Sequence, residues 1–240
     1  MRSGNPTLSN KAFQNMPRVT GQDVMTSTGA YLKTALLLLI CIGSASYTMN
    51  ANSGHFVMIG LIGGFILAMV TIFKKEWATI TAPLYALFEG LALGAISYMF
   101  DLRYPGIVMN AVLLTFAVMA IMLYIYSTGM IKVTDKLKKG VMIATGAIMV
   151  VYLINFVMGF FGSSISMIHS AGPLGIGFSL VVVGIATFNL LLDFDFIEKV
   201  AATGSAPKYM EWYSAFALMI TLVWLYLEIL RLLSKLNSRR

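Results

Sequence analysis

Hydrophobic residues in this chain form seven long runs, and polar residues gather in the short stretches between them. Each run is close to the ~20 residues that an α-helix needs to cross the hydrocarbon core of a bilayer. The runs are continuously apolar, whereas a membrane β-strand alternates over about ten positions. The pattern therefore predicts seven spanning helices, over 30–48, 55–73, 80–100, 106–127, 141–162, 174–194 and 212–234.

The connections between these runs are short and rich in turn-forming residues, as at 50–54, 101–106, 162–164 and 172–173. They leave no room for a soluble domain, so we expect one seven-helix membrane domain over 30–236. A polar N-terminal tail over 1–29, expected to be flexible, precedes it, and a basic tail over 237–240 follows it. The N-terminal tail lacks the pattern of a secretory signal, so the first run is expected to remain as a helix.

Composition supports an all-α integral membrane protein, because 58% of residues are hydrophobic, 11% are charged and the mean hydropathy is +0.82. The net charge of +7 does not indicate a nucleic-acid partner, because Lys and Arg stand at the ends of apolar runs. Cys41 is the single cysteine and lies inside the first run. We therefore expect no intrachain disulfide and no cysteine-based metal site.

Basic residues are distributed unevenly between the two ends of the predicted helices. The N-terminal region and the even-numbered connections hold twelve, including Lys138, whereas the odd-numbered connections hold only Arg103. This asymmetry predicts a cytoplasmic N-terminus in a multi-pass protein of the cell membrane. Seven crossings then place the basic C-terminal tail outside. A re-entrant segment with a cytoplasmic C-terminus remains open, and we favour seven crossings.

Glycines recur at the spacing that lets membrane helices approach closely. Gly60 and Gly64 form one GxxxG pair, and Gly90 and Gly94 form another. We expect these pairs to pack helices of this chain together, with a dimer interface as the alternative. The same use is expected of Gly159, Gly162, Gly175, Gly177 and Gly184.

Two acidic residues end the sixth run, where acids are costly and usually mark an ion, proton or substrate route. Asp193 and Asp195 are about 200° apart on a helix, so only one is expected to face the interior. Asp195 has Lys199 four residues on, as in an exposed surface pair. Asp193 follows Asn189 by one turn and is the better interior candidate.

The seventh run is apolar for more than a dozen residues before Glu228, which shares one helix face with Trp224, Arg231 and Lys235. Two interpretations of Glu228 remain open. It either pairs with Arg231 within the helix, near the headgroup region, or it points toward the acid of the sixth helix.

Glu89 lies near the centre of the third run, which is otherwise apolar. A carboxyl group at that depth is expected to be protonated or hydrogen-bonded to a neighbour. A structural hydrogen bond and a role in an ion pathway both remain open.

Motifs of several chemistries are absent from the sequence. There is no Walker A loop, no HExxH and no GxSxG, so no motif supports an ATPase, a metalloprotease or an α/β-hydrolase. We therefore expect a protein that is not an enzyme and that needs no cofactor.

Three stretches resemble the Bax inhibitor-1 family, also called the transmembrane Bax inhibitor motif family. Residues 88–90 with Leu93 resemble its F-x-E-G stretch, 193–197 its Y-D-T-Q-x-I stretch, and 225–230 its L-Y-L-D-hydrophobic stretch. The resemblance covers nearly the whole chain from residue 30 onward. Residues 2–9 look like the bacterial branch that includes YccA-like proteins of the inner membrane.

The resemblance implies six helices around a central seventh, with a carboxylate pair between helices six and seven that acts as a pH-sensing latch for calcium leak. Position by position, Asp193 and Glu228 would form the pair and could bind the transported calcium ion. The sixth-helix stretch departs from the family pattern, with Leu192, Phe194 and Asp195 where the family has Tyr, Thr and Gln. Asp195 could therefore replace Asp193.

A carboxylate latch has a simple physical basis. Two carboxylates within hydrogen-bond reach cannot both ionise cheaply, so they share a proton and couple the helices to pH. Their hard oxygen ligands suit calcium. The expected partners are the lipid bilayer, calcium ions and protons.

Two other function classes remain open. One is a non-conducting membrane partner that modulates a membrane protease or a stress response, with the acids serving only helix packing. The other is a small-solute transporter, which would show saturable uptake of its substrate.

Overall fold

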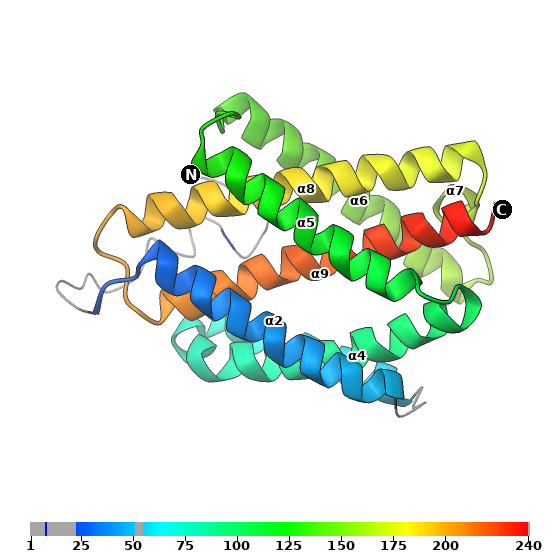
Figure 1. Cartoon of the computed structure of the whole chain (residues 1–240), viewed down its shortest axis with the longest axis horizontal. Coiled ribbons are helices and arrows are strands. Elements are labelled where there is room, and N and C mark those ends of the chain that lie inside the picture. Colours follow the sequence, from blue (N-terminus) through cyan, green and yellow to red (C-terminus); the bar gives the residue numbers. More distant parts are fainter. Residues whose placement is uncertain (1–7, 9–22, 51–54, 240) are drawn as a thin grey trace. The chain divides into compact units, whose positions relative to one another are not determined.

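The computed structural model describes residues 8, 23–50 and 55–239. Within this part, the chain forms seven long helices and two short ones, and its only β-type pairing is an isolated bridge between Val24 and Pro207 (Figure 1). The long helices are α2 (Ser27–Asn50), α3 (His55–Phe73), α4 (Ala78–Arg103), α5 (Ile107–Ser127), α6 (Asp135–Phe160), α8 (Pro173–Ala201) and α9 (Met210–Asn237). The short ones are η2 (Lys75–Trp77) and α7 (Ser166–His169).

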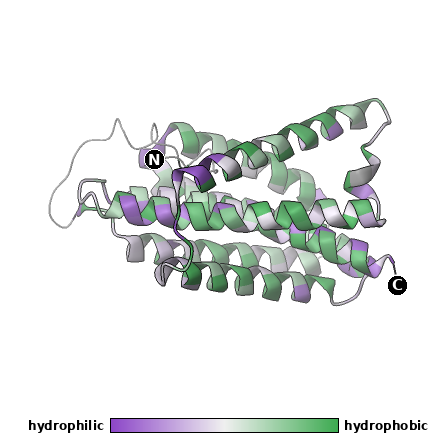
Figure 2. Cartoon of the chain, turned by 90° about the horizontal axis from the view of Figure 1, so that it is seen from above, coloured by the Kyte–Doolittle hydropathy of each residue, from purple (hydrophilic) through white to green (hydrophobic). Residues whose placement is uncertain are grey.

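All seven long helices are apolar and long enough to cross a membrane, which confirms the predicted fold class. Hydrophobic residues dominate their ribbons in Figure 2. Helix α9 is the most buried, with 67% of its apolar window inside the protein against 17–50% for the other six. This burial agrees with the central position expected for the last helix.

The described residues form two compact units. Unit 1 holds residues 8, 23–50, 55–105 and 196–220, and unit 2 holds 106–195 and 221–239. Helices α2, α3 and α4 belong to unit 1, α5 and α6 belong to unit 2, and α8 and α9 contribute residues to both. Most of the tail expected over 1–29 lies outside the described residues, as does most of the turn at 50–54. The single domain over 30–236 stays a prediction.

Helix α6 begins six residues before the apolar run that predicted it. The Thr134 hydroxyl accepts a hydrogen bond from the Leu137 backbone N–H at 3.2 Å, and Asp135 stands in the positively polarised first turn. This cap starts the helix early, so the lysines of the stretch lie within it. The prediction that Lys138 belongs to a connection is therefore wrong, and its side chain is buried.

Helix α8 continues seven residues beyond its predicted end at 194. It stops at Ala201, shortly before Gly204, whose φ of 60° is left-handed and suits glycine. Asp195 therefore lies inside the helix instead of at its end.

The two GxxxG pairs pack helices within unit 1, as expected. A Cβ added at Gly90 would collide with the Cys41 carbonyl of α2, and one at Gly60 would lie 2.5 Å from the Ala92 nitrogen of α4. The prediction that glycines pack helices closely is wrong for four others, where no atom lies within 4 Å of an added Cβ: Gly159, Gly162, Gly177 and Gly184. Gly175 faces the Ser170 carbonyl.

The start of α2 is bound to the first turn of α9 and to the connection before it, within unit 1. Glu211 accepts hydrogen bonds from the Thr26 N–H and hydroxyl, both at 2.9 Å, and pairs with Lys33. The Met25 N–H donates to the Ala206 carbonyl at 2.8 Å. These contacts satisfy backbone donors before the first turn of α2 and fix where the helix begins.

Candidate functional site

Asp195 of α8 forms an ion pair with Lys138 of α6. The Nζ–Oδ2 distance is 2.8 Å, and the side chains are 10% exposed for Lys138 and 6% for Asp195. The prediction that Asp195 is solvent-exposed at a helix end is therefore wrong. A buried pair of this kind neutralises both charges, whereas loss of either partner would leave the other charge unpaired.

Asp193 is fully buried, as the sequence predicts. Its Oδ2 accepts a hydrogen bond of 2.6 Å from the Thr221 hydroxyl of α9. Asp193 and Asp195 point in nearly opposite directions from α8, yet both are buried. The reason is that α8 has α9 on the side of Asp193 and α6 on the side of Asp195.

Asn189 lies one turn before Asp193 and is also buried. Its amide nitrogen donates to the Thr145 hydroxyl of α6 at 2.7 Å and to the Ile185 carbonyl at 3.0 Å. Its amide oxygen is buried with no hydrogen-bond partner among the described residues. This oxygen is therefore an acceptor without a donor inside unit 2.

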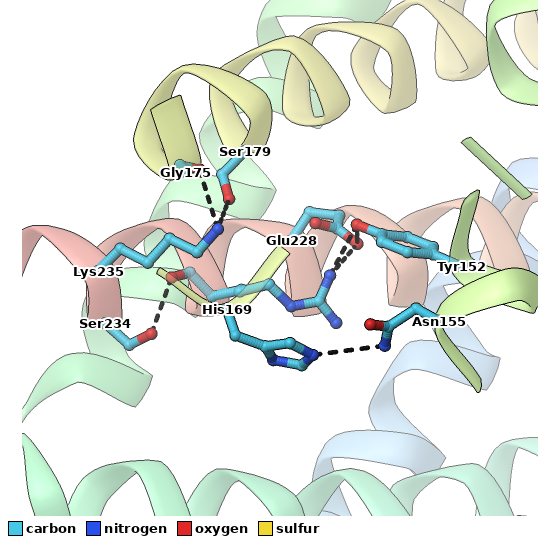
Figure 3. A network of polar contacts seen from close by, with 9 residues as sticks. Tyr152, Asn155, His169, Gly175, Ser179, Glu228, Ser234 and Lys235 are labelled. Carbon is cyan, nitrogen blue, oxygen red and sulfur yellow. Dashed lines mark hydrogen bonds and ion pairs between the residues drawn. The ribbon is translucent and has the colours of Figure 1, made fainter. Parts of the chain in front are cut away.

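Glu228 of α9 is held by two donors, as Figure 3 shows. Its Oε1 accepts from the Tyr152 hydroxyl of α6 and from Arg231 Nη1, each at 2.8 Å, and Arg231 also donates to the Tyr152 oxygen at 2.7 Å. The intrahelical pair with Arg231 is thus confirmed. The second carboxylate oxygen, Oε2, is buried with no hydrogen-bond partner in the described part of the chain.

The hydrogen-bonded pair between Glu228 and an acid of the sixth helix is not formed. Glu228 bonds to Tyr152 and Arg231, and neither Asp193 nor Asp195 reaches it. Thr221, the partner of Asp193, stands seven residues before Glu228, which is about 10 Å along the axis of α9. The expectation of a direct carboxylate latch is corrected accordingly, since each acid has a partner of another kind.

Lys235 extends the polar contacts toward the C-terminal end of α9. Its ammonium group is buried and donates to the Gly175 carbonyl at 2.9 Å and to the Ser179 hydroxyl at 2.8 Å, both on α8 (Figure 3). On α6, the Asn155 side chain contacts His169 at 3.4 Å and accepts from the Ile165 N–H at 2.9 Å. Asn155 therefore fixes the turn that leads into α7.

Together these side chains form a polar file along α6, α8 and α9 of unit 2. Its members are Lys138, Thr145 and Tyr152 on α6, Ser179, Asn189, Asp193 and Asp195 on α8, and Thr221, Glu228, Arg231 and Lys235 on α9. Three acidic and three basic residues balance its formal charge. The polar file thus places charged and neutral groups along a helix interface that is otherwise apolar.

Five members of the polar file escaped prediction: Lys138, Thr145, Tyr152, Ser179 and Thr221. On α6, Lys138, Thr145 and Tyr152 recur every seven residues, which places them on one helix face two turns apart. That spacing is a signal from which a shared polar face of α6 could have been predicted. Thr221 had no comparable signal, because a single threonine in an apolar helix most often bonds to its own backbone.

Glu89 belongs to unit 1 and has a different environment. The Tyr85 hydroxyl, one turn earlier on α4, is hydrogen-bonded to the Glu89 carboxyl group. On α3, a Cβ added at Gly64 would lie 3.1 Å from Glu89 Oε2. The expected hydrogen bond to a neighbour is therefore present.

The described residues contain no group of three or more His, Cys, Asp or Glu side chains placed to hold a metal ion. Asp193 and Glu228, the two residues expected to bind calcium, have separate partners on α9, Thr221 and Arg231, which are nearly three turns apart.

Comparison with known proteins identifies a family. The model of the family described as Bax inhibitor 1 like matches residues 5–238. No curated protein and no solved structure matches the chain. The bacterial branch stays a prediction. Because the family model covers nearly the whole chain, this multi-pass membrane protein belongs to the Bax inhibitor 1 like family.

Proposed function

We propose that the protein is a pH-sensitive leak channel for calcium ions in the cell membrane, with a cytoplasmic N-terminus, and that its ions pass along the polar file of unit 2. The observation that carries the proposal is the length of this file. From Lys138 to Tyr152 it follows α6 for about 21 Å, a large part of the roughly 30 Å hydrocarbon core. Polar and ionisable groups inside membrane helices are costly and usually line ion or proton routes.

Two buried oxygens of the polar file support passage of cations. Asn189 Oδ1 and Glu228 Oε2 have no hydrogen-bond donor among the residues described. Both are hard oxygen acceptors, the ligand type that calcium prefers. A cation or a water molecule moving past them would satisfy an acceptor that the protein leaves open.

Glu228 supplies the proposed pH sensitivity. Its ionised carboxylate accepts from both Tyr152 and Arg231, and Tyr152 links α9 to α6. Protonation weakens both hydrogen bonds, because a neutral carboxyl group is a poorer acceptor than a carboxylate. The link between α6 and α9 therefore loosens as pH falls, and we expect the leak to increase.

Calcium flux through purified protein in dye-loaded liposomes, measured from pH 5 to pH 8, tests the proposal. The expected flux rises toward pH 5. Glu228→Gln removes the charge at nearly constant shape, so its flux should lose its dependence on pH. Asp135→Asn is the matched control, since Asp135 is an exposed acid of the same unit. Absence of flux at every pH would reject the channel.

The second candidate is a non-conducting membrane partner that modulates a membrane protease or a stress response. Its support is the pairing of the acids, because Lys138 neutralises Asp195 and Arg231 neutralises Glu228. Such pairs serve helix packing without an ion route. Under this alternative, the liposomes show no flux, and changes at these residues alter only stability or complex formation.

A further inference from the structure

Glu89 is an acid in the middle of a membrane-spanning helix. It stands about 16 Å along the axis of α4 from Ala78 and about 21 Å from Arg103, so the ends of the helix are too far for its short side chain to reach water. Its side chain is only half-buried. The same stretches of α3 and α4 expose Leu61, Phe65 and Leu87. Glu89 is therefore partly exposed on a surface where large apolar side chains of α3 and α4 are exposed as well.

The neighbours of Glu89 supply one hydrogen-bond donor and no positive charge. On α4 the donor is the Tyr85 hydroxyl. Helix α3 presents Gly64, which has no side chain. Helix α2 contributes Cys41, whose sulfur carries no positive charge in either protonation state. The basic residue of α2 is Lys33, and it pairs with Glu211 instead. Within the described ranges, Glu89 has no ion-pair partner.

This environment differs from that of two acids in the polar file. Asp195 and Glu228 are each neutralised by a basic side chain, so they can remain charged inside the protein. An ionised carboxylate with one neutral donor and no counter-ion is costly at this depth, whereas a neutral carboxyl group is not. Gly64 leaves space for the carboxyl oxygen, and a larger residue there would press on it.

We propose that Glu89 carries a proton at neutral pH and forms a proton-binding site of unit 1, which hydrophobic carbodiimides can reach and modify from the bilayer. This site does not rest on the proposed channel function, because it involves none of the polar file.

The modification follows from the protonated state. The carboxyl oxygen of Glu89 bonds to the central carbon of the carbodiimide, and the carboxyl proton moves to one of the two nitrogens. The resulting O-acylisourea rearranges when its acyl group shifts to the other nitrogen, which gives a stable N-acylurea. Every atom of both reactants is retained, and no oxidant or reductant is needed. An ionised, hydrated carboxylate lacks the proton for the first step.

The test is treatment of the full chain in liposomes with dicyclohexylcarbodiimide at pH 7, followed by peptide mapping by mass spectrometry. We expect one adduct per chain, on Glu89. An ordinary hydrated glutamate carries a proton in roughly 1 of 500 molecules at pH 7, so native labelling should exceed labelling of the SDS-unfolded chain by about tenfold or more.

Two variants sharpen the result. Glu89→Gln should lose the adduct. Glu228→Gln should keep it, because the adduct forms on Glu89, whereas Glu228 is paired with a basic side chain. Peptide mapping of the wild type locates the adduct even if Glu89→Gln fails to fold. An unmodified Glu89 in the native protein, or equal labelling of the native and the unfolded chain, would overturn the proposal.

Discussion

Units 1 and 2 pack their helices in lipid by different means. In unit 1, α2, α3 and α4 approach through Gly60, Gly90 and Gly94, and the acid between them has no basic partner among the described residues. In unit 2, α6, α8 and α9 are joined by the polar file, whose members include Lys138, Thr221 and Tyr152. Membrane helices gain no hydrophobic drive to associate, so close backbone contact and interhelical hydrogen bonds are the available alternatives.

The contrast teaches that an acid in a membrane protein must be judged by its neighbours. Sequence position makes Glu89 and Glu228 similar, because each lies in an apolar helix. Glu228 has a counter-ion, whereas Glu89 has none in the part of the chain that the structure describes. The two glutamates should therefore respond differently to pH, to chemical modification and to substitution.

The largest expected effect comes from unpairing a charge in unit 2. Lys138→Met leaves Asp195 buried without its counter-ion, which should lower the free energy of unfolding by about 3–5 kcal/mol. Chemical denaturation in detergent measures this change. Lys139→Met is the matched control, since Lys139 is exposed on the same helix. Adding Asp195→Asn to Lys138→Met should recover part of the lost stability. A double variant no more stable than Lys138→Met would count against the pairing.

A substitution that adds one methyl group should break the packing of unit 1. Gly90→Ala forces a Cβ against the Cys41 carbonyl and the Ser44 hydroxyl, and we expect a loss of about 1–3 kcal/mol. Gly146→Ala on α6 meets no atom within 4 Å and should stabilise by roughly 0.5–1 kcal/mol, because alanine favours a helix interior. Thermal melting of both variants in the same detergent compares the two glycines. Shifts of equal sign would contradict the contrast.

Removal of one hydrogen bond in unit 2 should have a smaller effect. Thr221→Val keeps the shape and leaves Asp193 Oδ2 without its hydroxyl donor, which should cost about 1.5 kcal/mol. Thr221→Ser retains the donor and loses one buried methyl group, so it should cost only about 0.5–1 kcal/mol. Denaturation curves of the pair separate the lost hydrogen bond from lost packing. Equal stability of Val and Ser at this position would show that the bond contributes little.

The smallest effect should come from Tyr152→Phe, because Glu228 keeps its pair with Arg231. The substitution removes the hydroxyl that donates to Glu228 and accepts from Arg231, and we expect a loss of about 1 kcal/mol because these two side chains stay bonded to each other. Thermal melting of the variant and the wild type in the same detergent measures this loss. A variant as stable as the wild type would contradict the arrangement in Figure 3.

The sequence predicted the helices well because their signal is local. Apolar runs located all seven, and the errors fell where polar residues continue a helix, as at Lys138 and Asp195. Partners across helices are set by which faces meet, and hydropathy carries no information on that. The burial of Asp193 and the Glu228–Arg231 pair could be reasoned from spacing, whereas the bond between Thr221 and Asp193 could not.

The bond between Glu211 and Thr26 has a consequence for how the chain is assembled. It joins residues 185 positions apart, so the start of α2 acquires its anchor only after nearly the whole chain has been synthesised. Residues 196–220 also complete unit 1, although they follow most of unit 2 in the sequence. The start of α2 therefore gains these hydrogen bonds only after α9 has begun to form, and a chain that ends before Glu211 would lack them.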